Sequence, residues 1–183
     1  MLYATIVTTK DELEQISVLN KKNLKQNISA EEKQQEGFVT WLYPLDLLQQ
    51  IHELASSVIV KEDDIVVGYA LVTLKKAGEF HPDLKTMISN LETLRYNNKP
   101  LNSYSYYIMG QVCINKVYRG RGVFYMLFQH HKKLYSGNYE LLVTEISARN
   151  HRSQKAHEKI GFKTIHTYHD AIDEWNVVVW DWT

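Results

Sequence analysis

The segment Tyr106–Leu134 constrains the fold of this chain more than any other, because its hydrophobic pattern changes across a short glycine turn. It begins with the apolar run Tyr106–Ile114, typical of a buried strand, and ends with apolar residues at helical spacing from Val123 onward. The sequence Arg-Gly-Arg-Gly at 119–122 lies between them. This order predicts a strand, a tight turn and a helix in direct succession.

Other hydrophobic patterns predict the elements around this segment. Helical spacing predicts helices at Asp11–Lys25, Pro44–Leu54, Asp83–Leu94 and Ser153–Ile160. Apolar and alternating runs predict strands at Val58–Val60, Ile65–Leu74, Tyr139–Ile146, Phe162–Tyr168 and Trp175–Trp182. The order of these elements indicates a mixed α+β fold around one sheet.

The glycine turn has the composition of an anion-binding loop. Glycines allow backbone N–H groups at the start of a helix to approach an anion, and the positive helix end attracts negative charge. The spacing around Gly120 and Gly122 does not fit a P-loop or a dinucleotide fingerprint. Taken alone, the turn is also compatible with a core helix that follows two solvated arginines.

A second motif lies some thirty residues downstream, and with it the chain resembles the GNAT acyltransferase superfamily. The family's pyrophosphate-loop pattern, Arg/Gln-x-x-Gly-x-Gly/Ala, is matched at Arg119 and Gly122, whereas Phe124 replaces the small residue. A later family motif is matched in order by Asn150, Ser153, His157, Gly161 and Phe162, with His157 where many members have tyrosine.

The resemblance implies a GNAT-like fold and function. We expect one central, mostly antiparallel sheet, splayed between its fourth and fifth strands, with helices on both faces and a single domain over residues 1–183. The implied activity is transfer of an acetyl group from acetyl-CoA to a primary amine of a small molecule or a protein. A catalytically weak acyl-CoA-binding module with a regulatory role is the alternative, and an RNA-binding protein is a third.

The resemblance also implies the residues that bind acetyl-CoA. Backbone groups of Val112, Cys113 and Ile114 would contact the pantetheine arm, and Arg119, Gly120, Arg121, Gly122, Val123 and Phe124 would surround the pyrophosphate. Asn150 and Ser153 complete the predicted cofactor-binding set. Cys113 is expected to act through its backbone rather than as an acylated nucleophile.

Two residues are candidates for proton transfer. Glu145 lies where some family members carry a catalytic glutamate, so the resemblance implies a base there; a strand glutamate facing solvent or paired with lysine is the alternative. His157 would protonate the departing thiolate, unless it is a packed helix histidine. Gln111 could only orient water or substrate, because an amide is not basic.

The resemblance places the acceptor amine beside the first helices and the long connection before Tyr106. The corresponding segments, Lys33–Pro44 and Lys76–Ser105, are rich in aromatic residues and histidine, including Phe38, Trp41, Tyr43, Phe80, His81, Tyr96 and Tyr104. They would form either a wall for an apolar or cationic acceptor or anchors for long loops.

Charge and composition narrow the function classes. The 183 residues carry 21 basic and 21 acidic side chains, which argues against a nucleic-acid-binding protein. The balance is uneven, because residues 116–169 hold ten basic and three acidic groups, as a polyanionic cofactor would require. The histidine spacings and the single cysteine predict no metal site.

Targeting signals are also not evident in the sequence. No stretch approaches 18 consecutive apolar residues, and the first residues lack the pattern of a secretory signal. We therefore expect a cytoplasmic protein without a membrane partner. The oligomeric state stays open, with a homodimer among the alternatives.

Overall fold

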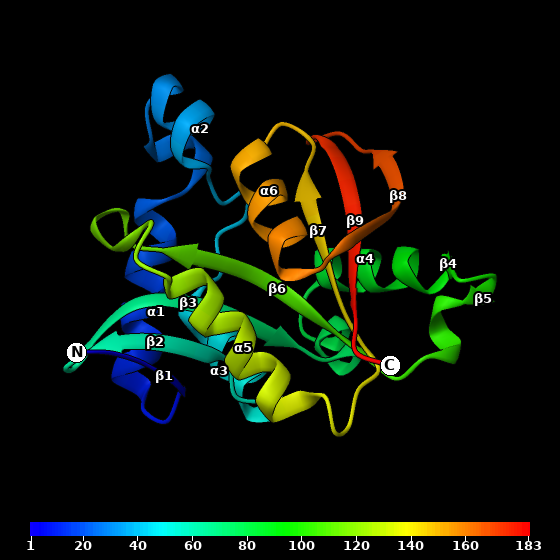
Figure 1. The fold of residues 1–183 in the computed structure, drawn as a ribbon, viewed down its shortest axis with the longest axis horizontal. Coiled ribbons are helices and arrows are strands. Elements are labelled where there is room, and N and C mark those ends of the chain that lie inside the picture. Colours follow the sequence, from blue (N-terminus) through cyan, green and yellow to red (C-terminus); the bar gives the residue numbers. More distant parts are fainter.

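In a computed structural model of the chain, seven strands of the described residues form one mixed sheet with helices against both faces (Figure 1). The structure describes residues 1–183 apart from the side chains of residues 34–36. The strands are β1 (Leu2–Ile6), β2 (Val58–Glu62), β3 (Ile65–Thr73), β6 (Tyr106–Ile114), β7 (Leu141–Ser147), β8 (Lys163–His169) and β9 (Glu174–Asp181). The α-helices are α1 (Lys10–Lys22), α2 (Ala30–Glu36), α3 (Leu45–Leu54), α4 (Pro82–Glu92), α5 (Val123–Tyr135) and α6 (His151–Ile160).

The sheet is interrupted between its fourth and fifth strands. Its order is β1-β2-β3-β6-β7-β9-β8, and every neighbouring pair is antiparallel except β6 and β7. Those two strands are parallel, and their pairing is limited to Tyr106–Ile108 against Leu141–Val143. Beyond this point they diverge, which confirms the predicted splay and the predicted fold class.

A bulge lies where β6 begins to leave β7. In the pairing of β3 with β6, two residues, Gly110 and Gln111, oppose Leu71 alone, and such a bulge bends the strand and increases its twist. A Cβ atom at Gly110 would lie 2.8 Å from the Tyr43 hydroxyl, so glycine is required at this close approach.

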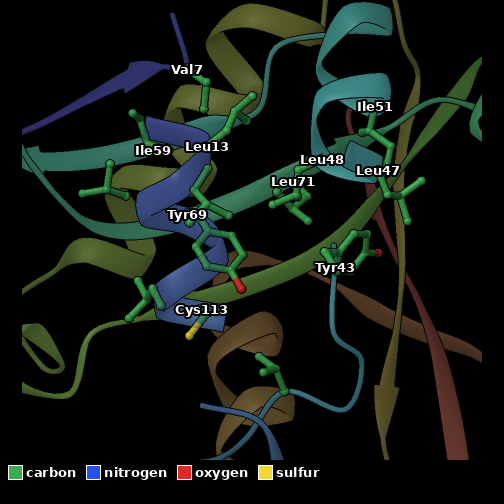
Figure 2. Packing of buried hydrophobic residues seen from close by; sticks show 14 of the residues in the cluster. Val7, Leu13, Tyr43, Leu47, Leu48, Ile51, Ile59, Tyr69, Leu71 and Cys113 are labelled. Carbon is green, nitrogen blue, oxygen red and sulfur yellow. The ribbon is translucent and has the colours of Figure 1, made fainter. Parts of the chain in front are cut away.

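Helices α1 and α3 cover one face of the sheet, and α5 and α6 cover the other. Figure 2 shows the first face, where side chains of α1 and α3 pack over Tyr69 and Leu71 of β3. On the opposite face, Phe128 of α5 packs with Phe162 and Trp180. Burial of each such side chain contributes about 2 kcal/mol to the free energy of unfolding. Packing on both faces therefore stabilises the sheet on either side of the splay.

One α-helix and three strands were not predicted from the sequence. Strand β1 follows an alternating apolar pattern, and α2 begins at a capping box in which Ser29 and Glu32 bond each other's backbone N–H groups. A short hairpin, β4 (Arg95–Tyr96) and β5 (Lys99–Pro100), turns through Asn97 and Asn98. The predicted helix at Ser153 begins two residues earlier, at His151, because Asn150 caps it.

Candidate functional site

The glycine turn forms an open cradle at the start of α5. Gly120 and Gly122 have φ angles of 77° and 80°, and a Cβ atom added at either would meet no other atom within 4 Å. Gly122 is the N-cap of α5, so the first N–H groups of the helix point toward this open space. The cradle therefore has the shape and the electrostatics of an anion site.

A cavity of about 650 Å³ extends from this cradle, and we call it the basic cavity. Among the described residues that line it, four carry positive charge and none carries negative charge. The positive residues are Arg119, Arg152, Lys155 and Lys159. An extended polyanion would find complementary charge along this surface.

The predicted cofactor-binding residues gather around the basic cavity with one exception. Val112, Cys113, Ile114, Arg119, Gly120, Gly122, Val123, Phe124, Asn150 and Ser153 all line it. Arg121 does not: its guanidinium lies 3.9 Å from Glu62 and 4.9 Å from the ring centroid of Tyr118. The resemblance implies that Arg121 contributes its backbone N–H, so its place in the cofactor-binding set stays a prediction.

Arg119 is held by the surrounding protein. Its Nε donates to the Ile114 carbonyl oxygen at 3.1 Å, and its Nη2 donates to Asn23 Oδ1 at 2.7 Å. These bonds fix the guanidinium at the edge of the basic cavity. The residue thus contributes charge to the cavity and also ties the glycine turn to the end of α1.

A second cavity, of about 310 Å³, lies where β6 and β7 diverge, and we call it the acidic cavity. Three carboxylates line it, from Asp83, Glu145 and Asp170, and none of its described lining residues is Lys or Arg. The two cavities share five lining residues, which are Phe38, Val39, Val112, Asn150 and Ser153. They are therefore adjacent spaces of opposite charge.

Glu145 brings a carboxylate with altered acidity into the acidic cavity. Its Oε1 atom is buried and has no hydrogen-bond partner among the described residues. Burial raises the pKa of Glu145 to about 7, although the neighbouring Tyr168 hydroxyl opposes this shift. Near neutral pH such a carboxylate can both accept and release a proton.

His157 is buried in an aromatic environment. Only 1% of the residue is exposed, and its ring centroid lies 5.0 Å from Phe124 and from Phe162. Its Nδ1 lies 2.8 Å from the Ser153 carbonyl oxygen, which requires a proton on Nδ1 and leaves Nε2 as an acceptor without a partner among the described residues. Burial lowers the pKa of His157 to about 4, so the ring is neutral at pH 7, which differs from the predicted role of an acid.

Cys113 faces the α1 side of the sheet, where Figure 2 shows it below Tyr69. Burial raises the pKa of the Cys113 thiol to about 12. The thiol is therefore protonated at neutral pH, and a nucleophilic role for this residue has no chemical support.

A buried amide clamp holds the loop that forms one wall of the acidic cavity. Asn20 Nδ2 donates to Gln111 Oε1 at 2.6 Å, Gln111 Nε2 donates to the Trp41 carbonyl oxygen at 2.9 Å, and the Tyr43 N–H donates to Asn20 Oδ1 at 3.0 Å. The Gln111 amide is thus used to position the loop. Asn20 was missed in the sequence, because its partners lie far from it along the chain.

An ion cluster around the buried Asp173 carboxylate holds the β8–β9 turn, which contributes Asp170 and Ile172 to the lining of the same cavity. The Asp173 side chain is 1% exposed and accepts hydrogen bonds from Arg149 at 2.7 Å, Ser147 at 2.9 Å and Lys25 at 3.3 Å. Burial alone would raise the pKa of Asp173, but the Arg149 and Ser147 hydrogen bonds hold it below its ordinary value. This cluster joins the start of α6 to the β8–β9 turn, and no sequence pattern indicated it.

The aromatic residues expected near an acceptor divide into two groups. Phe38, Trp41 and Tyr43 line the acidic cavity, whereas Phe80, His81, Tyr96 and Tyr104 do not. His81 supports the wall indirectly, because its ring lies 5.0 Å from that of Trp41. Residues 34–36 of the predicted acceptor segment Lys33–Pro44 lie outside the described side chains.

The part of the chain that the structure describes was also considered for metal ligands and membrane-spanning helices. No group of three or more His, Cys, Asp or Glu side chains in this part of the protein is placed to hold a metal ion. None of the described helices is long and apolar enough to span a membrane.

Comparison with solved structures identifies the fold. No family model matches the sequence, and no curated protein matches it by sequence. The ribosomal-protein-S18-alanine N-acetyltransferase from Escherichia coli is similar over 99% of this chain and 94% of its own, with a TM-score of 0.66 and 10% identity. A GNAT-family acetyltransferase from Bacillus cereus covers 99% of this chain and 97% of its own, with a TM-score of 0.62 and 13% identity.

A further solved structure extends the comparison to a protein bound to a CoA derivative. Arabidopsis thaliana Naa50, in complex with the bisubstrate analogue CoA-Ac-MVNAL, is similar over 99% of both chains, with a TM-score of 0.64 and 17% identity. At these identities the likeness concerns the fold rather than the substrate. This chain has the fold of the GNAT N-acetyltransferases.

Proposed function

We propose that residues 1–183 form a single GNAT domain that transfers an acetyl group from acetyl-CoA to a primary amine. The observation that carries this proposal is the meeting of two oppositely charged cavities at the splay, with Glu145 in the acidic one. A basic cavity suits the phosphates of CoA, and an acidic cavity suits an ammonium group.

The residues present fit acetyl-CoA. The open cradle at Gly120 and Gly122 has room for a pyrophosphate beside the first N–H groups of α5. After Ile108, β6 has no strand partner on its β7 edge, and there the Met109 carbonyl oxygen accepts a hydrogen bond from the Thr144 hydroxyl. The backbone groups on this edge beyond Met109 are the ones available to an amide-containing arm. When bound, acetyl-CoA would supply an activated acetyl thioester.

The acceptor must lose a proton before it can react. An alkylamine with a pKa near 10.4 is neutral in roughly one molecule in 2,500 at pH 7, a deficit of about 4.6 kcal/mol. We assign the base role to Glu145, because its raised pKa and unpartnered Oε1 suit a group that accepts a proton inside the cavity.

The proton balance of the reaction can be met by Glu145 alone. The carboxylate takes one proton from the ammonium group, and the free amine nitrogen then bonds to the acetyl carbon as the carbon–sulfur bond breaks. The sulfur keeps the bonding electron pair and receives a proton from Glu145. The second proton of the amine nitrogen passes to solvent, so amide, thiol and one proton are the products.

This assignment leaves His157 without an acid role. Its neutral ring, with the Nδ1 proton bound to the Ser153 carbonyl oxygen, has no acidic proton to give to a thiolate near pH 7. We propose instead that His157 packs beneath the site between Phe124 and Phe162. The donor role inferred from the resemblance stays a prediction, which the variant His157→Gln would test.

The experiment combines acetyl-CoA binding by calorimetry with CoA release in the presence of a panel of primary amines. We expect binding and amine-dependent release, with release lost in Glu145→Gln and kept in Glu158→Gln, a control at an exposed position on α6. Tight binding without release across the panel would assign the alternative, a regulatory acyl-CoA-binding module. Absence of acetyl-CoA binding would refute both readings.

A further inference from the structure

The acidic cavity has more negative charge than the transfer of an acetyl group to a single amine requires. Transfer to an amine needs one base, yet three carboxylates, Asp83, Glu145 and Asp170, line this space without a Lys or Arg among the described lining residues. The adjoining basic cavity has the reverse composition. The cavity therefore favours a ligand with more positive charge than a single amine has.

Two residues that line the same cavity each carry a buried acceptor atom without a donor among the described residues. Neither Glu145 Oε1 nor His157 Nε2 has a hydrogen-bond partner among the described residues, although both atoms are buried. A buried acceptor left without a donor destabilises the fold, and a ligand that supplies the donor removes this penalty. An ammonium group provides N–H donors and no acceptor, so it is the kind of group that this lining lacks.

Aromatic side chains surround the carboxylates. Trp41 and Tyr43 come from the clamped loop, with ring centroids 4.4 Å apart, while Tyr168 and Trp175 come from the β8–β9 hairpin. Aromatic faces attract cations and also pack against methylene groups. A chain of methylene groups with a charge at each end would match both properties.

The distal wall of the cavity is built by the connection between β3 and β6. One face of α4, with Asp83, Thr86, Met87 and Asn90 at helical spacing, lines the cavity. His81, the N-cap of α4, accepts a hydrogen bond from the Asp83 N–H and packs against Trp41. The helix is thereby attached to the clamped loop, and Asp83 is held at one side of the cavity.

We infer that the acceptor is a small diamine or polyamine, with the reacting amine at Glu145 and a second ammonium group at Asp83. This inference rests on the proposed function, because it assigns the acceptor of the same site. A cavity of about 310 Å³ lies at the small end of the range of about 300–1,000 Å³ for small-molecule sites. A protein amine is the competing acceptor, and the test includes it.

The test compares amines of equal length that differ in their second charge. Butane-1,4-diamine, butylamine and 4-aminobutanoate are assayed by CoA release. A short peptide with a free N-terminus, an amidated C-terminus and uncharged side chains represents a protein amine. We expect kcat/KM for the diamine to exceed that for butylamine by about fivefold, because the Asp83 side chain is 71% exposed and an exposed ion pair contributes no more than this. The preference should fall with added salt. The anionic amine should be the poorest substrate.

A matched pair of variants locates the second charge. Asp83→Asn should reduce the preference for the diamine over butylamine at least threefold, and Asp46→Asn should leave it unchanged. Asp46 is also in the first turn of a helix but does not line the cavity, so both variants lose the same helix-terminal charge. An unchanged preference in Asp83→Asn would overturn the assignment.

The remaining outcomes separate the inference from the proposed function. Release that is equal or faster with butylamine or with the peptide would overturn the diamine assignment and leave acetyl transfer intact. If no amine causes release, calorimetry of the CoA-saturated protein with butane-1,4-diamine and butylamine decides the matter. Tighter binding of the diamine would support the inference even though transfer had failed, and equal binding would overturn it.

Discussion

Asn20 of α1 and Gln111 of the β6 bulge meet side chain to side chain, with 2.6 Å between Nδ2 and Oε1, and both donate to the Trp41 carbonyl oxygen. One amide pair thus connects a helix, a strand and the loop that walls the acidic cavity. Loss of this pair should displace the loop, whereas the glycine cradle should keep its conformation.

Asn20→Ala should therefore act on the acceptor. We expect a loss of about 2 kcal/mol in the free energy of unfolding, because buried partners lose their hydrogen bonds, and a several-fold rise in the KM for the amine. Acetyl-CoA affinity should stay near that of the wild type. Asn27→Ala, at an exposed position, is the control; equal effects on both substrates would contradict the positioning role.

Gly122→Val should abolish acetyl-CoA binding. The side chain would enter the open space of the cradle, and the φ angle of 80° also disfavours it by about 1–2 kcal/mol. Thermal unfolding checks that the variant folds, and calorimetry measures binding. Gly137→Val, at a glycine with open surroundings and ordinary φ, should bind normally; unchanged affinity in Gly122→Val would refute the cradle.

Activity should rise with pH as Glu145 loses its proton. Because the base must be ionised, log kcat/KM should increase through a midpoint of about 7. Glu145→Gln should lower kcat at least 100-fold and remove this limb of the profile. A limb that persists in the variant would assign the titration to another group.

The same carboxylate should make stability depend on pH. Folding raises the pKa of Glu145 from 4.5 to about 7, so its contribution to stability is fully present below pH 4.5 and is lost as pH rises through 7. Glu145→Gln should consequently be more stable than the wild type at pH 8, by up to about 3 kcal/mol. Urea unfolding at pH 4 and pH 8 measures the difference, which should vanish at the lower pH.

His157→Gln tests the two roles considered for this residue. The amide retains an acceptor but cannot supply an acidic proton, so a packing role predicts less than a tenfold change in kcat. A loss of 100-fold or more, with acetyl-CoA affinity unchanged, would restore the thiolate-protonating role that the family resemblance implies.

Asp173→Asn should weaken the fold beside the cavity. Removing the buried negative charge weakens its hydrogen bonds to Ser147, Arg149 and Lys25, at a cost of about 1–2 kcal/mol, because Arg149 and Lys25 remain accessible to water. The pKa of Asp173 is lowered on folding, so its stabilising effect is present above its ordinary pKa of 3.8 and is lost as pH falls through the lower folded value. Urea unfolding of the variant at pH 7, with the exposed control Asp64→Asn, checks the magnitude.

The sequence predicts the cofactor-binding part of the site better than it predicts the acceptor-binding part. The strand, turn and helix around Gly122 are contiguous, and Asn150 precedes its own helix, so local patterns were sufficient to predict both. The amide clamp and the Asp173 cluster each join residues more than twenty positions apart, and Asn20 and Gln111 are separated by 91. Such contacts exist only once the sheet has assembled.

The state of His157 also could not be predicted from its place in a motif. The motif aligned it with a tyrosine, but burial among Phe124, Phe128 and Phe162 decides its protonation. Strand β1 and helix α2 are a different case, because their local signals, alternating apolar residues and a capping box, are present in the sequence.

The short parallel pairing of β6 with β7 divides the sheet into two antiparallel halves, of four and three strands. Their backbones join at Tyr106–Ile108 and Leu141–Val143, whereas Glu145 and the bulge lie beyond that seam. A small rotation of one half against the other would change the width of the gap at Glu145 without breaking any antiparallel pair. The seam therefore controls the width of the gap from a distance. A substitution at Leu141–Val143, none of which lines the acidic cavity, would alter which acceptors fit while leaving every lining side chain in place.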